Sequence, residues 1–114
     1  DDETAKNVTI ETGMGTRTRT GSTTGTQEMT TCGGWFPAEP NHVMTVEDSM
    51  SMTVRATSTG DVRLWLLGGQ SNFCGEGTAA QEVFRFWTRG TIEVYVGTAN
   101  QGEQLDYELE FIED

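Results

Sequence analysis

The chain has 114 residues, of which 18 are acidic and 7 are lysine or arginine, giving a formal net charge of -11. This charge repels nucleic-acid phosphates and anionic lipid headgroups, so it argues against nucleic acid as a partner. The length predicts a single domain, and we expect no membrane insertion because no apolar run approaches the roughly 20 residues that a membrane-spanning helix needs.

The N-terminus starts with the acidic run DDE, whereas a signal peptide starts with positive charge and an apolar stretch. We therefore interpret the sequence as a mature chain from which any targeting segment has been removed. Further along, the run NVTIE over residues 7–11 predicts a short strand that carries Val8 and Ile10.

Threonine and glycine dominate residues 12–31, where large apolar side chains are almost absent. Such a segment cannot bury a core face of its own, so it is a linker, a tail or a strand that depends on a partner. The run TRTRT alternates two residue types at strand period, which favours strand addition to a sheet edge of its own domain or of a neighbouring copy. Our sharpest expectation is that residues from about 8 to 30 pair outside their own compact domain. The predicted contact residues of this arm are Val8, Ile10, Thr16, Thr18 and Thr20.

The two cysteines, Cys32 and Cys74, have no second cysteine or histidine at metal-ligand spacing, which excludes a closed zinc site. Two alternatives remain for them. One is a disulfide, which implies an oxidising compartment, and the other is a pair of unrelated buried thiols in an intracellular protein.

Residues 31–43, TCGGWFPAEPNHV, predict an architectural corner at the start of the sheet. The two glycines permit a backbone turn, and the Trp-Phe pair is expected to cap one end of the core. The two prolines hold the segment extended until Val43 begins a strand.

Alternating apolar residues predict the strands that follow, each with one buried face. The predicted inward residues are Met50, Met52, Val54 and Ala56 in residues 49–57; Val62, Leu64 and Leu66 in residues 62–69; Phe84 and Phe86 in residues 82–87; Ile92, Val94 and Val96 in residues 91–98; and Leu105, Tyr107, Leu109 and Phe111 in residues 105–114. We see no substantial helix, because no long segment keeps a 3.6-residue apolar period. The sequence therefore predicts an all-β fold, an antiparallel β-sandwich or jelly-roll over residues 32–114, with an extended N-terminal arm over residues 1–31.

Several motifs occur in a fixed order along this β region: Cys32, the run PNHV leading into a strand, Phe73-Cys74 after a Gly-Gly turn, RGTIEVYVGT and a closing QGEQLDYELEF. In this combination the sequence resembles the bacterial pre-peptidase C-terminal (PPC)-like domains, over about Cys32 to Ile112. The resemblance implies a small secreted β-sandwich, a noncatalytic role, and a disulfide between Cys32 and Cys74. Domains of that group are usually appended to other proteins, often peptidases.

His42 is the only histidine, and a serine or cysteine nucleophile would need it as a base together with a third, orienting group. The serines at 49, 51 and 58 lie in predicted strands or turns without a nucleophile-elbow pattern. Carboxylate pairs arise by composition in an acidic chain, whereas a glycosidase needs two of them across a cleft. We therefore expect no catalytic residue, and we interpret His42 as a strand-entry residue whose ring satisfies a local hydrogen bond.

Calcium is the one metal ion that the sequence suggests, because Asp48, Asp61, Glu76 and Glu82 lie in or beside predicted turns and hard cations take carboxylate oxygens. A D-x-D-x-D-G loop is absent, which favours a solvated acidic rim over a built site. Apart from calcium, no cofactor is predicted.

Four aromatic residues, Trp35, Trp65, Trp87 and Tyr95, suggest a surface that stacks on sugar rings. Packing against a neighbouring sheet or subunit explains Trp65 and Trp87 equally well.

Together these features predict a secreted, extracellular, noncatalytic structural protein that assembles with further copies of itself through its N-terminal arm. A head-to-tail contact that does not close on itself generates a filament. The alternative is a monomeric PPC-like binding module for a polysaccharide or a cell-surface protein, with or without calcium.

Overall fold

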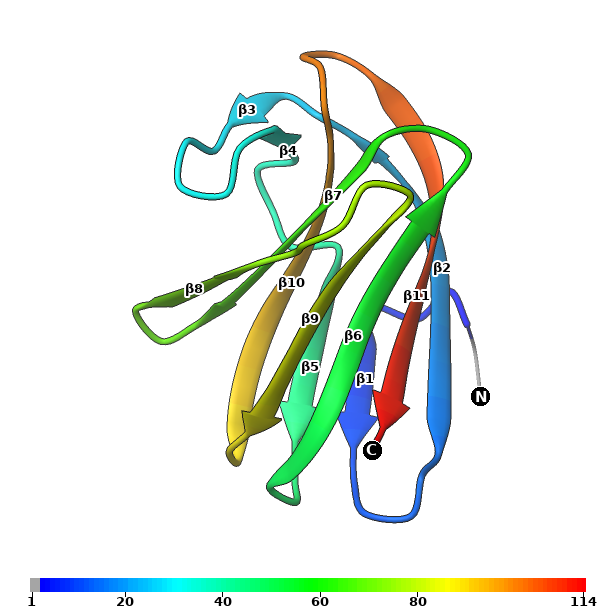
Figure 1. Ribbon diagram of the computed structural model, residues 1–114, viewed down its shortest axis with the longest axis vertical. Coiled ribbons are helices and arrows are strands. Elements are labelled where there is room, and N and C mark those ends of the chain that lie inside the picture. The colour runs from blue at the N-terminus through cyan, green and yellow to red at the C-terminus, as the bar shows by residue number, and fades with distance from the viewer. Residues whose placement is uncertain (1–2) are drawn as a thin grey trace.

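Strands and turns make up residues 3–114, the part of the chain that this computed structural model describes, and no helix occurs in that part (Figure 1). The strands are β1 Asn7–Ile10, β2 Thr16–Thr24, β3 Gln27–Glu28, β4 Trp35–Phe36, β5 His42–Val46, β6 Met50–Ser58, β7 Val62–Gly68, β8 Ser71–Cys74, β9 Ala80–Trp87, β10 Gly90–Thr98 and β11 Gln104–Glu113. They form two sheets with a shared core between them, which confirms the predicted all-β sandwich.

The first sheet is built around β10. Strands β5 and β1 extend it on one side, and β7 and β8 extend it on the other. Beyond the end of β5, strand β4 pairs with the end of β10, and β3 pairs with β4. The second sheet has the order β2-β11-β6-β9. Among the described strands the ladders are antiparallel except for β1 with β5, which is parallel. Strands β8 and β9 therefore both lie at sheet edges, one in each sheet.

The core contains side chains from both sheets. The predicted inward residues of β6, β7 and β11 are at most 8 % exposed, and so are Val94 and Val96 of β10. Ile92 is half-buried and packs against the same core. These expectations are confirmed because successive side chains of a strand point to opposite faces, so one apolar series fixes the buried side.

Strand β9 is oriented opposite to the prediction. Phe84 and Phe86 are 59 % and 63 % exposed, whereas Val83 and Trp87 are buried in the core. The Trp87 indole N–H donates to the carbonyl of Met52 at 2.9 Å, which satisfies its polar group inside the core. The prediction was wrong because both faces of this strand are apolar, so the alternation alone does not say which face is buried.

The N-terminal segment belongs to the sandwich itself. Val8 and Ile10 of β1 are at most 1 % exposed, and β1 pairs with β5 of the same chain. Strand β2 pairs with β11 from Thr16 opposite Ile112 to Thr24 opposite Gln104. The expectation that this segment pairs outside its own domain is therefore wrong for β1 and β2. Residues 31 and 32 mark no domain boundary either, because β3 pairs with β4 across them.

Two arginines of the TRTRT run hold this segment in place by hydrogen bonds, since it has little apolar area to bury. Arg19 is 3 % exposed, and its guanidinium donates to the carbonyls of Asn7 at 3.1 Å and Thr18 at 2.9 Å. The Arg17 guanidinium donates to the carbonyl of Thr9 at 2.8 Å and pairs with Glu11. Both side chains thus join β2, at the edge of one sheet, to β1, at the edge of the other.

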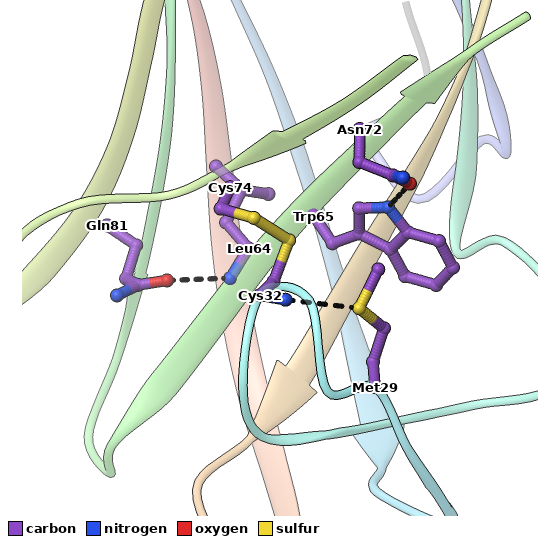
Figure 2. The surroundings of a disulfide bond; sticks show 7 residues. All are labelled: Met29, Cys32, Leu64, Trp65, Asn72, Cys74 and Gln81. Atoms are coloured by element: carbon purple, nitrogen blue, oxygen red, sulfur yellow. Dashed lines mark hydrogen bonds between the residues drawn. A yellow bond between two sulfur atoms is a disulfide. The ribbon is translucent and has the colours of Figure 1, made fainter. Parts of the chain in front are cut away.

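The corner that begins at Cys32 packs on the outer face of the first sheet. Cys32 and Cys74 form a disulfide, which ties the loop between β3 and β4 to β8 (Figure 2). The buried Phe36 ring meets the Trp65 indole edge-on at 5.5 Å, outside the main core. The predicted corner and the disulfide are confirmed, but the aromatic pair covers a sheet face and does not cap the core.

Candidate functional site

His42 lies inside the sandwich, 2 % exposed, where it joins three segments. Its Nδ1–H donates to the carbonyl of Ala5 at 3.0 Å, and its Nε2 accepts from the Tyr107 hydroxyl at 2.8 Å. Burial lowers the pKa of His42 and raises the pKa of Tyr107 to about 12. The predicted role of the ring, to satisfy a local hydrogen bond at the entry to a strand, is confirmed. This arrangement holds the residues before β1 against β11.

The four calcium candidates do not gather at one place. Asp48 accepts from the backbone N–H of Thr12 at 2.9 Å, and Asp61 forms an ion pair with Arg63. Glu82 pairs with Arg55, and Glu76 and Glu82 face each other only through their backbones. Within residues 3–114, no group of three or more His, Cys, Asp or Glu side chains is placed to hold a metal ion.

Two of the four aromatic residues proposed for sugar stacking fill space inside the protein. Trp87 and Tyr95 are 3 % and 8 % exposed, so neither ring is available at the surface. The Trp65 indole is half-buried, stacks on Tyr95 at 4.1 Å, and donates its N–H to Asn72 at 2.8 Å. Trp35 is half-buried on β4. The prediction is therefore wrong for Trp87 and Tyr95, and the structure explains Trp65 by packing.

The exposed aromatic surface is on β9. Phe84 and Phe86 are the large apolar side chains that the described part of the chain leaves exposed. Their partners in β6 across the outer face are Thr53 and Ser51, which are too small to cover a phenyl ring. Contiguous exposed apolar side chains at a sheet edge mark interaction sites more often than isolated ones do.

A groove of about 440 Å³ runs beside Phe86, between β8 of one sheet and β9 of the other. Phe73 forms part of its wall, and the Phe73 ring meets the Trp87 ring edge-on at 5.4 Å. The Arg85 guanidinium lies over the Phe73 ring at 4.5 Å from its centroid, a cation–π arrangement. Arg89 lines the same groove.

The charges of the two groove arginines are not neutralised within the described residues. Arg17, Arg55 and Arg63 each form an ion pair with a carboxylate, whereas no carboxylate of residues 3–114 is within ion-pair distance of Arg85 or Arg89. In a chain with a formal net charge of -11, this concentrates two unneutralised cations at one place. We call the exposed set Phe84, Arg85, Phe86 and Arg89 the β9 surface. Its chemistry suits a partner that offers apolar side chains together with a carboxylate.

The sequence does not predict the β9 surface, because its alternating pattern assigns Phe84 and Phe86 to the core. One signal was present: the run VFRFW has apolar side chains on both faces, and its arginine is the one polar residue. A strand that is apolar on both faces is either central in a sheet or exposes an apolar face, so the pattern alone leaves both outcomes open.

No family model matches the sequence, and no curated protein matches it. Solved structures do resemble the fold. The pre-peptidase C-terminal domain of collagenase from Bacillus anthracis aligns with a TM-score of 0.59 at 16 % identity, over 96 % of this chain and 95 % of that chain. This likeness confirms the PPC-like fold that the sequence suggested.

Two further neighbours are PliG proteins, described as periplasmic lysozyme inhibitors of g-type lysozyme. The Salmonella Typhimurium protein has a TM-score of 0.54 at 14 % identity, covering 97 % of this chain and 100 % of its own. The Aeromonas hydrophila protein has a TM-score of 0.51 at 13 % identity, covering 96 % and 98 %. At these identities the comparisons establish the fold alone. In residues 3–114 there is no helix long and apolar enough to cross a membrane.

Proposed function

We propose that this chain is a secreted, noncatalytic binding module that recognises another protein through the β9 surface. The observation that carries the proposal is the exposure of Phe84 and Phe86, at 59 % and 63 %, on the outer face of a sandwich whose other large apolar side chains in the described residues are buried or half-buried. Covering these rings contributes about 1–2 kcal/mol each, scaled from the value for a fully buried phenylalanine. That gain is available only when a partner is bound.

The neighbouring arginines make the surface selective. A purely apolar patch binds any apolar surface, whereas Arg85 and Arg89 favour a partner that places a carboxylate beside its apolar groups. The other described arginines with ion pairs lie outside this groove. Charge complementarity therefore distinguishes the β9 surface from the remaining acidic exterior.

Two observations support a location outside the cytoplasm. Disulfides persist in oxidising compartments, and this chain forms one between Cys32 and Cys74. Two fold neighbours, at 13 % and 14 % identity, are described as periplasmic proteins that inhibit an enzyme, which is a function exerted by binding. We place the chain in the periplasm or outside the cell.

Site-specific photo-crosslinking tests this function. Benzoylphenylalanine is incorporated in place of Phe86 and, as a control, in place of the exposed Glu108 on the same outer face of the sheet. On irradiation in cells that secrete the protein, we expect an adduct with a different protein at position 86 and none at position 108. Crosslinks that join only two copies of this chain, or equal yields at both positions, would overturn the proposal.

A further inference from the structure

The backbone of β9 is available for pairing on its outer side. Glu82 donates its N–H to the carbonyl of Glu76 at 2.9 Å and accepts from the N–H of Glu76 at 3.0 Å. The backbone groups of Glu82 therefore point away from β6. Because these groups alternate in direction along an antiparallel strand, those of Phe84 and Phe86 also point away from β6.

The groups at Phe84 and Phe86 have no backbone partner within the described residues. The ladder of β9 is with β6 alone, and the bridge to Glu76 ends before Phe84 is reached. Each of the two residues thus presents one N–H donor and one carbonyl acceptor at the sheet edge. An edge with such groups in a row is a template for an added strand.

The side chains around this edge specify what the added strand would carry. Phe84 and Phe86 are on the outer face, while Arg85 points to the opposite face and lies over Phe73. A strand beside β9 alternates in the same way, so its residues opposite the phenylalanines meet phenyl rings. The residue between them meets the Arg85 guanidinium, which favours a carboxylate.

A second copy of this chain is a poor occupant of the edge in the register that pairs both phenylalanines. Pairing two β9 strands about a two-fold axis so that each Phe84 faces Phe86 places Arg85 opposite Arg85, and like charges directly opposite are destabilising. Each copy also has a formal net charge of -11. A segment of another protein that carries one carboxylate avoids the opposed arginines and adds little repulsion.

We propose that the partner binds by strand addition: an extended segment with an apolar–acidic–apolar triplet pairs its backbone with Phe84 and Phe86 on β9. This inference rests on the proposed function, since it specifies how the β9 surface recognises its protein partner. The carboxylate of the triplet binds Arg85, and its two apolar side chains cover the phenyl rings.

The probe for the test is a linear dodecapeptide. It is selected by display of a random peptide library on the immobilised protein, with counter-selection against the Phe84→Ser/Phe86→Ser double variant. We expect the selected peptides to share the apolar–acidic–apolar triplet. The tightest peptide is then synthesised as a series in which each backbone nitrogen is methylated in turn, and binding to the wild-type protein is measured.

Strand addition predicts a period of two in this series. Methylation at amides that face β9 weakens binding about tenfold each, the value of one hydrogen bond, whereas the amides between them tolerate it. On the protein side, Phe86→Pro is compared with Phe86→Ala: both remove the ring, but only proline removes the edge N–H. We expect about tenfold weaker binding for the proline variant. Proline is tolerated where a strand N–H faces outward. If the proline variant does not fold, the methylation series tests strand addition by itself.

The outcomes separate the two proposals. Peptides that require the phenylalanines but tolerate methylation at every position would overturn strand addition and leave the β9 surface as the binding site. A selection that yields no peptide able to distinguish the wild-type protein from the double variant would overturn both.

Discussion

Removing the disulfide by Cys32→Ala with Cys74→Ala tests how the corner stabilises the sandwich. The bond joins residues 42 positions apart, and closing a loop of that length costs the unfolded chain about 4 kcal/mol of conformational free energy in the chain-entropy model. The substituted protein should therefore lose about 4 kcal/mol of unfolding free energy. For a chain of this length, that corresponds to a melting temperature lower by about 15 °C.

Urea unfolding followed by tryptophan fluorescence measures this change, because Trp65 lies beside the disulfide (Figure 2). Wild-type protein treated with a reductant serves as the matched control and should unfold at the same urea concentration as the double variant. A loss below about 1 kcal/mol would refute the reasoning, since the loop would then be held by packing alone.

Three further predictions concern stability. Arg19→Met should cost about 2–3 kcal/mol in urea unfolding, because buried carbonyls lose charged donors; an unchanged midpoint would contradict that role. Gly34→Ala should lower the melting temperature more than Gly33→Ala: both glycines have a positive φ, but only at Gly34 would an added Cβ lie 2.9 Å from a backbone oxygen, that of Thr98. Equal losses of melting temperature would contradict this. The unfolding free energy should fall as pH drops below 6.5, because burial lowers the pKa of His42 in the folded protein and the unfolded chain therefore takes up the proton first. His42→Gln should remove this part of the pH dependence of stability, and an unaltered pH dependence in the variant would refute the assignment.

The alternation of apolar residues predicted the buried faces of β6, β7, β10 and β11 correctly, because in each strand the buried face carries at least three apolar side chains and the other face at most two. In strand β9 both faces carry large apolar side chains, Val83 and Trp87 on one and Phe84 and Phe86 on the other. Which of these two faces is buried depends on the position of β9 at the sheet edge, a long-range property that a local pattern does not contain. The motif order also predicted the PPC-like fold and the disulfide.

The N-terminal segment was misjudged because its burial was estimated from apolar area alone. Arg19 is buried through bonds to carbonyls of Asn7 and Thr18, and the sequence gives no sign that β1 would lie within reach of its guanidinium. The same limit applies to Arg85 and Arg89. Their importance follows from the absence of a neighbouring carboxylate in the described structure, which depends on the arrangement of the whole sandwich.

Amide hydrogen exchange at the edge of β9 tests the central claim most directly. In the free protein, the N–H groups of Phe84 and Phe86 point outward without a partner and should exchange fast, whereas those of Val83 and Arg85 face β6 and should exchange slowly. Adding the selected peptide should slow exchange at Phe84 and Phe86 specifically. Slow exchange at these two amides in the free protein, or protection by the peptide confined to another part of the sandwich, would contradict the account.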